Sequence, residues 1–261
     1  VYEWDTGKYL GEIAQARETY NVVGNMNEHQ LTIGETTFGG REELIDPNGI
    51  IDYGSLIYIT LQRAKNAREA IKIMTDLVAE YGYYSGGESF SIGDPNEIWV
   101  LEMISKGKDR KGAVWVAVRI PDDCISAHAN QARIQQFPLN DPNNCIYSKD
   151  VISFAKEKGY YTGKDEDFSF AKAYNPLDFG GQRFCEARVW SFFNRYNKDM
   201  AGFVTYAQGK TQDPMPLYIK PDQRLSIAEI KEMMRDHYEG TALEWSNDVG
   251  GGPFKFPYRL A

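Results

Sequence analysis

The sequence is poor in the residue types that most metal and disulfide sites need: it has three histidines and three cysteines among 261 residues. His29, His128 and His237 are far apart, and none has a second His or Cys at helical or turn spacing. We therefore expect no metal site. An odd number of cysteines cannot all pair, and no C-x-x-C motif occurs, so buried free thiols are expected. A bridge between Cys124 and Cys145 is the alternative.

The signatures of several other functional classes are also missing. The net charge is −8 and no run of Lys or Arg occurs, which argues against a nucleic-acid partner because phosphate binding needs a basic face. No apolar stretch approaches the length of a membrane span, so no membrane partner is expected. The chain has neither a G-x-S-x-G elbow nor a phosphate-binding loop with G-x-x-x-x-G-K-[ST] spacing. We expect no cofactor.

What the sequence does have is an ordinary globular composition, with 42% hydrophobic and 13% aromatic residues. Apolar residues at helical spacing, or capping signals, predict helices at 55–64, 66–81, 149–158, 184–196 and 226–240. Alternating patterns predict two short strands and a turn within 21–38, a strand–turn–strand unit at 88–104, and strands at 112–120 and 124–134. Tight turns between neighbouring strands predict an antiparallel sheet and a layered α+β domain.

Capping signals refine the limits of three of these helices. Ser55 is a candidate N-cap for the first helix, and Gly82 is a candidate stop for the second. Ser226 precedes Glu229 by three residues, which predicts a capping box, with Gly240 ending that helix.

One predicted strand carries an unusual set of polar side chains, in the stretch SAHANQARI at 126–134. Strand alternation would put Ser126, His128 and Asn130 on one face, with small alanines beside them. An amide NH₂ at Asn130 could donate to a developing oxyanion, which is a strong effect in a preorganised site. The structural alternative is an Asn on the sheet surface that hydrogen bonds to a neighbouring loop.

Four stretches resemble the bacterial C69 dipeptidases: VGNMNEHQLTIGETTFGG, ESFSIGDPNEIWVLEM, GAVWVAVRIPDDCISAHANQARI and HYEGTALEWS. These dipeptidases are N-terminal-nucleophile (Ntn) hydrolases related to bile salt hydrolases and penicillin V acylases. The resemblance runs through nearly the whole chain. It implies a four-layer αββα fold, with two antiparallel sheets between helical layers, and a single domain over residues 1–261.

The resemblance also implies a catalytic mechanism. In this family the nucleophile is a cysteine that becomes the first residue after processing, and its own α-amino group serves as the base. This chain begins at Val1, and none of its cysteines occupies that place. We therefore expect residues 1–261 to be a fragment that lacks the nucleophile segment and a C-terminal part, and that is itself inactive.

The family's catalytic positions can be carried over residue by residue. Asn130 matches the strand that supplies the main oxyanion-hole group, and Thr37 falls where the bile salt hydrolases have an oxyanion-hole Asn. A late arginine near the nucleophile falls on Arg183 or, with a shifted alignment, on Arg188; Arg183 is preferred. A cation there could lower the pKa of the thiol.

Four further residues are expected to contact or shape the place of the substrate, and all but one lie in the polar stretch at 25–37. Glu35 is expected to meet the free ammonium group of a dipeptide, with Thr36 beside it. His128 is expected to shape the pocket as a neighbour of Asn130. Asn27 belongs to the hairpin motif shared with the related acylases.

These observations predict a cysteine-type dipeptidase whose partner is a small peptide substrate. Two alternatives remain open: a non-catalytic module that binds peptides or amino acids, and an N-acyl-amide hydrolase of the same fold. Strand edges exposed by truncation would favour association, so a homo-oligomer is one expectation. Precursors of this kind often carry export signals, which makes a periplasmic or secreted bacterial protein one expectation, but the sequence leaves the compartment open.

Overall fold

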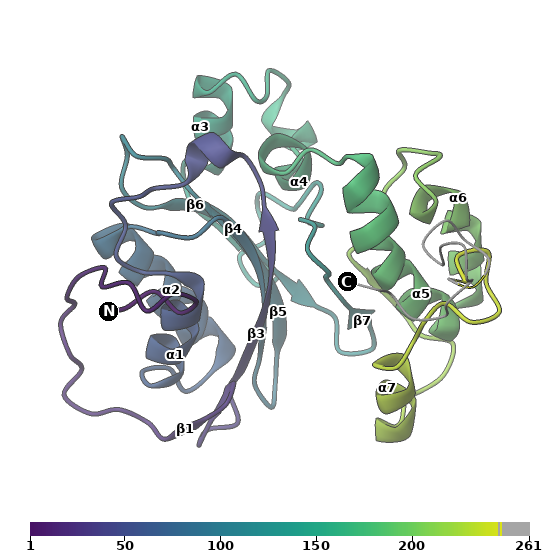
Figure 1. Ribbon diagram of the computed structural model, residues 1–261, viewed down its shortest axis with the longest axis horizontal. Coiled ribbons are helices and arrows are strands. Elements are labelled where there is room, and N and C mark those ends of the chain that lie inside the picture. The colour runs from purple at the N-terminus through teal and green to yellow at the C-terminus, as the bar shows by residue number, and fades with distance from the viewer. Residues whose placement is uncertain (245, 247–261) are drawn as a thin grey trace. The chain divides into compact units, whose positions relative to one another are not determined.

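The computed structural model describes residues 1–244 and residue 246, and the chain divides into two compact units (Figure 1). The first unit contains Val1–Asp122 and Asn130–Leu177. The second contains Asp123–Ala129 and Asp178–Ala261. Asn130 is therefore the residue at which the chain returns to the first unit.

The first unit is built on an antiparallel sheet whose strands follow the order β1-β2-β3-β4-β5-β6-β8. The strands are β1 Val22–Val23, β2 Met26–Asn27, β3 Thr32–Gly39, β4 Gly87–Gly93, β5 Ile98–Ser105, β6 Ala113–Ile120 and β8 Cys145–Tyr147. Every neighbouring pair is antiparallel. This order confirms the predicted sheet and the α+β class, because strands joined by tight turns pair with their neighbours in the chain.

The region 21–38 differs in detail from the predicted pair of strands, because it forms three. β1 and β2 pair through Val22 with Asn27, and β2 then pairs with β3 through Met26 and Thr32. The second turn uses Gln30, whose φ is 64°. Asn27 is the last residue of β2.

Two helices cover one face of this sheet, α1 (Tyr53–Leu61) and α2 (Ala67–Tyr81) (Figure 1). The main core lies between them and β3–β6, and includes fully buried Phe90 and Trp99. The two predicted helices are confirmed, and Gly82 ends α2 with a φ of 79°. The prediction of Ser55 as N-cap is wrong. Asp52 is the N-cap of α1, and its carboxylate accepts a hydrogen bond from the backbone N–H of Ser55 at 3.3 Å.

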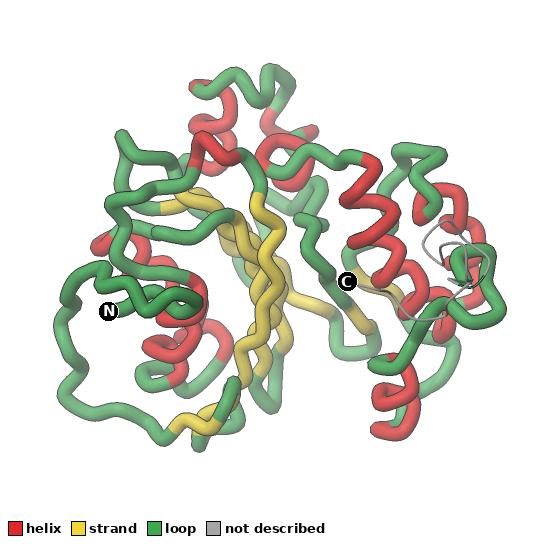
Figure 2. Tube along the Cα trace, viewed as in Figure 1, coloured by secondary structure: helices red, strands yellow, loops and turns green. Residues whose placement is uncertain are grey.

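Shorter elements complete the first unit. They are the 3₁₀ turns η1 Glu42–Leu44 and η2 Asp165–Asp167, and the helices α3 Val151–Glu157 and α4 Phe170–Tyr174. Helix α3 contacts both α4 and β6 and confirms the helix predicted at 149–158. The first 21 residues form no helix or strand apart from an isolated bridge between Tyr2 and Tyr9 (Figure 2).

The second unit is mainly helical. Its elements are β7 Ile125–Ser126, η3 Gly181–Glu186, α5 Ala187–Tyr196, η4 Lys198–Phe203, α6 Val204–Ala207, β9 Tyr218–Ile219 and α7 Ile227–Met233. β7 and β9 pair antiparallel. The capping box of Ser226 and Glu229 is confirmed, but α7 ends at Met233, so Gly240 is not its stop. The π-helical turn η3 runs directly into α5, where the sequence predicted a helix from residue 184.

The strand predicted at 124–134 is the largest error in the fold prediction. Only Ile125–Ser126 is a strand, and residues 127–134 have no regular secondary structure. Asn130 has a φ of 62°, in the left-handed region that strands do not use. The alternating faces expected for His128 and Asn130 therefore do not exist.

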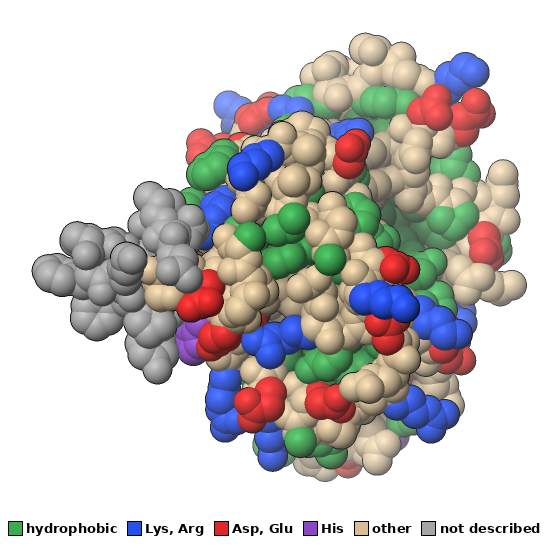
Figure 3. Space-filling view, turned by 90° about the vertical axis from the view of Figure 1, so that its right-hand side faces the viewer, with side chains coloured by type: hydrophobic (Ala, Val, Ile, Leu, Met, Phe, Trp, Pro, Cys, Tyr) green, Lys and Arg blue, Asp and Glu red, His purple; other side chains and the backbone are tan. Residues whose placement is uncertain are grey.

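The described residues also bear on the predicted absences. The three cysteines are free, so the alternative Cys124–Cys145 bridge is not formed. Within residues 1–244 and 246, no group of three metal-ligating side chains comes together. In the same part of the chain no helix is long and apolar enough to cross a membrane. Acidic and basic side chains are interspersed on the face shown in Figure 3.

Candidate active site

Thr37, near the end of β3, is the residue around which the candidate site of the first unit is arranged. The side-chain amide of Asn130 donates from Nδ2 to the backbone carbonyl oxygen of Thr37 at 2.7 Å. The register of β3 with β4 shifts between Thr37 and Gly39, which marks a β-bulge. Bulges often lie beside active sites because they redirect a side chain and interrupt pairing. The structure thus brings together the two residues predicted to form an oxyanion hole, 93 positions apart in the chain.

The segment after Asn130 is fixed by a second amide side chain, Asn175. Asn175 accepts a hydrogen bond at Oδ1 from the backbone N–H of Ala132 at 2.9 Å, and its backbone carbonyl accepts one from Gln131 Nε2 at 3.0 Å. Its own Nδ2 donates to the carbonyl of Phe38 at 3.4 Å. Asn175 therefore ties the Asn130 segment to the end of β3, and this holds the Asn130 amide in place before any ligand arrives.

A buried glutamate on β5, Glu102, also fixes the segment that follows Asn130. Glu102 is fully buried, and its carboxyl accepts from the backbone N–H groups of Arg133 at 2.5 Å and Ile134 at 3.1 Å, and from the Ser89 hydroxyl at 3.4 Å. Burial raises the pKa of Glu102 from its ordinary value near 4.5 to about 7, although these hydrogen bonds and the Arg133 charge lower it. Glu102 is thus a structural anchor for the loop that carries Asn130.

The raised pKa of Glu102 predicts a specific dependence of stability on pH. Between about pH 4.5 and 7 the folded protein keeps a proton that the unfolded chain has released. The contribution of Glu102 to the free energy of unfolding should therefore fall by about 3 kcal/mol as pH rises through this window, and it should be constant above the window. Denaturant unfolding of the wild type and of Glu102→Gln at a series of pH values checks this.

The Glu102→Gln variant should have a smaller slope than the wild type in this window, because glutamine does not titrate whereas Glu88, whose pKa is also raised, still does. Its absolute stability will also differ, since one acceptor for the two backbone N–H groups becomes a donor, so only the slope is compared. Glu18→Gln, an exposed position, is the matched control and should keep the wild-type slope. Equal slopes in the wild type and Glu102→Gln would contradict the prediction.

Two carboxyl groups lie next to Thr37 on the helix-covered face of the sheet. Thr37 is opposite Glu88 in the β3–β4 register, and Glu35 precedes Thr37 by two residues and so shares its face. The Thr37 hydroxyl donates to Glu88 Oε1 at 2.9 Å. Oε2 of Glu88 and Oε2 of Glu35 are both buried without a hydrogen-bond partner.

The charge state of Glu88 follows from this environment. Glu88 is 1% exposed, and burial raises the pKa of its carboxyl well above the ordinary value. The hydrogen bond from Thr37 opposes this rise, whereas the neighbouring Glu35 carboxyl adds to it because two like charges this close cannot both ionise easily. Glu88 therefore keeps its proton at neutral pH in the empty site.

The N-terminal segment forms the wall opposite these carboxyls by attaching to the start of α1. The backbone N–H of Trp4 donates to Asp52 Oδ2 at 2.9 Å, and the Tyr53 hydroxyl donates to Asp5 Oδ1 at 2.9 Å. The Trp4 side chain rests against Gly54, where a Cβ would lie 2.5 Å from Trp4 Cγ. A glycine at this position is what allows the indole to lie there.

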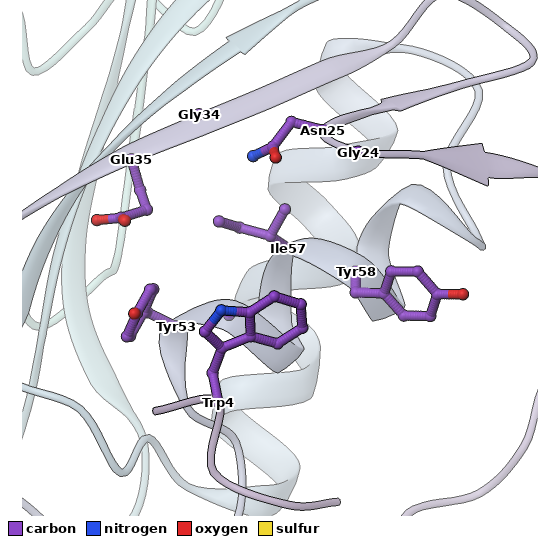
Figure 4. A pocket seen from close by; sticks show the side chains of 9 residues that line it. Trp4, Gly24, Asn25, Gly34, Glu35, Tyr53, Ile57 and Tyr58 are labelled. Carbon is purple, nitrogen blue, oxygen red and sulfur yellow. The ribbon is translucent and has the colours of Figure 1, made fainter. Parts of the chain in front are cut away.

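Two cavities result, and Tyr53 lines both. The first, of about 400 Å³, is lined by Trp4, Gly24, Asn25, Gly34, Glu35, Tyr53, Gly54, Ile57 and Tyr58 (Figure 4). In Figure 4 the Glu35 side chain projects from its strand toward the side of the cavity on which Trp4 and Tyr53 lie. The second cavity, of about 310 Å³, is lined by Glu3, Asp5, Thr37, Ile45, Pro47, Asp52, Tyr53, Tyr84, Ser85, Gly86 and Glu88. Both cavities are therefore acidic and partly aromatic.

Two other predicted substrate residues lie away from these cavities. The side chain of Thr36 points to the opposite face of β3 from Glu35 and Thr37, since strand neighbours alternate. Asn27 is 5% exposed and uses its whole amide within the fold. Its Nδ2 donates to the carbonyls of Leu61 and Ala64, and its Oδ1 accepts from two backbone N–H groups of the following turn. These bonds give Asn27 a structural role.

The remaining predicted residues, His128 and the two arginines, belong to the second unit. His128 is half-buried there. Arg183 lies in η3 and is 6% exposed, and burial lowers the pKa of its guanidinium. Arg188 donates from Nη2 to the backbone carbonyl of Ala129 at 2.8 Å. Arg188 therefore polarises the peptide group that Ala129 shares with Asn130.

Sequence reasoning missed several residues of the site. Glu88 and Glu102 were read as ordinary strand residues, although each is a single acid within an otherwise buried strand, which is a usable signal because buried charges need a reason. Trp4 and Tyr53 gave no signal, since their meeting depends on how residues 1–21 fold back on α1. Asn175 gave none either, because its contacts are made through tertiary structure.

The exposed Asn130 amide is held against Thr37, and Thr37 lines the second, acidic cavity. Amide donors that are fixed in advance stabilise oxyanions in hydrolytic enzymes. The comparison with known families agrees with this class. The profile of peptidase family C69 matches residues 3–259, and the chain belongs to this family.

Several bacterial proteins are similar to the chain. A probable dipeptidase of Salmonella dublin is 30% identical over 233 residues, which cover 85% of this chain and 50% of that protein. A probable dipeptidase of Latilactobacillus sakei is 27% identical, covering 85% of this chain and 45% of that protein. A dipeptidase of Bifidobacterium longum (strain NCC 2705) is 29% identical, covering 82% and 40%. The chain thus spans about half the length, or somewhat less, of the curated relatives it matches.

Proposed function

We propose that the protein to which this chain belongs is a dipeptidase that uses an N-terminal cysteine as its nucleophile. Membership of peptidase family C69 and the similarity to proteins named dipeptidase support the reaction class. The observation that most supports the proposal is the 2.7 Å hydrogen bond from Asn130 Nδ2 to the carbonyl oxygen of Thr37, since these are the two residues expected to contribute to the oxyanion hole. In this proposal both units belong to one αββα domain that further segments complete.

The proposed reaction has two stages. The cysteine thiol gives its proton to its own α-amino group, and the thiolate attacks the carbonyl carbon of the dipeptide. The oxyanion is stabilised by Asn130 and the Thr37 region. The amine of the second amino acid then leaves with the transferred proton, which gives an acyl-enzyme. Water hydrolyses this thioester and releases the first amino acid.

The arginines have separate parts in the proposal. Arg183 would provide the cation that lowers the pKa of the nucleophilic thiol, as the family resemblance suggests. Arg188 would act as a positioning residue, because its hydrogen bond to the Ala129 carbonyl polarises the N–H of Asn130 across the shared peptide group. His128 would shape the pocket, and Asn27 would hold β2 against the end of α1.

The test uses the full-length protein from its source. We expect it to hydrolyse dipeptides and to lose more than nine-tenths of that activity, roughly, when an N-terminal cysteine is alkylated with iodoacetamide, since the thiolate is the nucleophile. Release of free amino acids before and after alkylation is the measurement, and the mass of the intact protein shows whether it starts with cysteine. Activity that survives complete alkylation would rule out this mechanism.

The two alternatives have their own outcomes in the same experiment. A protein that hydrolyses N-acyl amino acids faster than dipeptides is an N-acyl-amide hydrolase of the same fold. A native protein that starts at Val1, binds dipeptides and releases no product is a binding module. The acidic lining of both cavities favours a substrate with a free ammonium group, and so favours the dipeptidase.

A further inference from the structure

Two carboxyl groups next to Thr37, those of Glu88 and Glu35, each have one buried oxygen to which no backbone N–H or other side chain donates a hydrogen bond. Glu88 is 1% exposed and lines the second cavity, yet its Oε2 has no hydrogen-bond partner. Oε2 of Glu35, which lines the first cavity, has none either. A buried carboxyl oxygen without a partner is costly, and the cost is removed when a cation with N–H donors binds. In the empty site the proton that Glu88 keeps faces the Glu35 carboxyl. A ligand with an ammonium group can take the place of this proton, which is then released to solvent, and supply N–H donors to both carboxylates.

The position of this carboxyl pair fits the N-terminus of a dipeptide. In a dipeptide the ammonium nitrogen lies roughly 2.5 Å from the scissile carbonyl carbon, because only the first Cα separates them. An ammonium site must therefore adjoin the oxyanion site. Thr37 belongs to both, since its carbonyl oxygen accepts from Asn130 and its hydroxyl donates to Glu88.

The first cavity suits the side chain of the first residue of such a substrate. It begins at Glu35 and is bounded by the indole of Trp4, the ring of Tyr53 and the side chain of Ile57 (Figure 4). The hydrogen bond from Tyr53 to Asp5 fixes that ring. About 400 Å³ between aromatic and aliphatic walls is enough for a large side chain, which aromatic walls hold by burial and ring contacts.

Resting on the proposed dipeptidase activity, we propose that Glu88 and Glu35 together bind the α-ammonium group of the substrate, and that the cavity bounded by Trp4, Tyr53 and Ile57 takes the side chain of its first residue. The enzyme is thereby an aminodipeptidase that requires a free N-terminus and prefers a large apolar first residue. Glu88, which the family resemblance did not single out, is the main ammonium ligand because it contacts Thr37 directly.

The test measures binding, so that it does not depend on turnover. The full-length protein, alkylated to stop any reaction, is titrated with L-phenylalanine amide and with N-acetyl-L-phenylalanine amide by calorimetry. We expect the free amine to bind about 10- to 100-fold more tightly, as a charge-assisted hydrogen bond allows. Glu88→Gln and Glu35→Gln should each reduce this ratio to near one, whereas Glu80→Gln, an exposed isosteric control, should keep it. Equal affinity for the two amides, or an unchanged ratio in Glu88→Gln, overturns the proposal.

The side-chain pocket is tested with a second pair of ligands, L-phenylalanine amide and L-alanine amide. The wild type should prefer the phenylalanine compound, and Trp4→Ala should reduce that preference about two- to tenfold, as expected for a lost aromatic contact. Tyr9→Ala, which changes an exposed aromatic residue outside both cavities, should leave it unchanged. If Trp4→Ala leaves the preference unchanged, the side chain of the first substrate residue does not bind in this cavity, and this part of the proposal is wrong.

These results separate this inference from the proposed function. If the protein hydrolyses dipeptides but binds both phenylalanine amides equally, the proposed function stands and the ammonium site is refuted. If the protein binds the free amine selectively through Glu88 but hydrolyses no dipeptide, the ammonium site stands and the dipeptidase activity is refuted.

Discussion

Replacing Asn27 with aspartate is expected to destabilise the protein by about 3 to 5 kcal/mol, the range seen when a buried charge is left without compensation. Asn27 Nδ2 donates to the carbonyl of Leu61 at 2.8 Å and to that of Ala64 at 2.7 Å. An aspartate would place a carboxylate oxygen against these two carbonyl oxygens and lose both donors. Because Leu61 is the last residue of α1, the substitution should loosen the contact between β2 and the end of that helix.

Denaturant unfolding of Asn27→Asp and the wild type at neutral pH measures this effect. Asn48→Asp, an exposed Asn-to-Asp change, is the control and should alter the free energy of unfolding by less than about 0.5 kcal/mol. A loss below about 1 kcal/mol in Asn27→Asp would show that the buried amide is not needed for the fold. Asn27 would then become available again as a substrate contact.

Substitution of Asn130 is expected to have the largest effect on catalysis. In the full-length protein Asn130→Asp should lower kcat about 10²- to 10³-fold with little change in KM, which is the usual result of removing one oxyanion donor. A carboxylate cannot donate to the oxyanion and repels it. Asn130→Gly should have a similar effect, and it tolerates the φ of 62° that would strain an alanine.

Steady-state kinetics with a dipeptide measure both constants, and circular dichroism checks that each variant folds. Asn140→Asp is the matched control, since Asn140 is exposed and its change alters only surface charge. A change confined to KM would mean that Asn130 binds the substrate in its ground state. An unchanged kcat in both variants would remove Asn130 from the oxyanion hole and would leave the structural alternative, a side chain that fixes a loop to Thr37.

Local sequence signals predicted the regular elements of the first unit well. The apolar spacing of 66–81 and the Gly82 stop are local features, and α2 follows them closely. The turn at 94–96 likewise separates two strands as expected. The prediction failed at 127–134, because that segment is held by contacts distant in sequence: Glu102 binds its backbone N–H groups and Asn175 binds Ala132.

The candidate site was predictable only in part, for a related reason. Asn130 and Thr37 were predicted through a family resemblance and Glu35 from its charge; the structure shows that Asn130 and Thr37 are in contact. The pairing of Glu35 with Glu88 depends on the register of β3 with β4, which the sequence does not specify by itself. Trp4 reaches the site through a loop of irregular structure, and no periodicity describes such a path.

The close approach of the Trp4 indole to Gly54 gives the pocket an adjustable wall. Gly54 has no side chain and takes no part in the proposed reaction. The Trp4 indole lies against it, and the backbone N–H of Trp4 is fixed by one hydrogen bond to Asp52. Any larger residue at this position would push the ring outward or into the cavity. Relatives of the proposed dipeptidase could therefore differ in their selectivity for the first amino acid through a single helix residue, while the proposed catalytic groups stay unchanged.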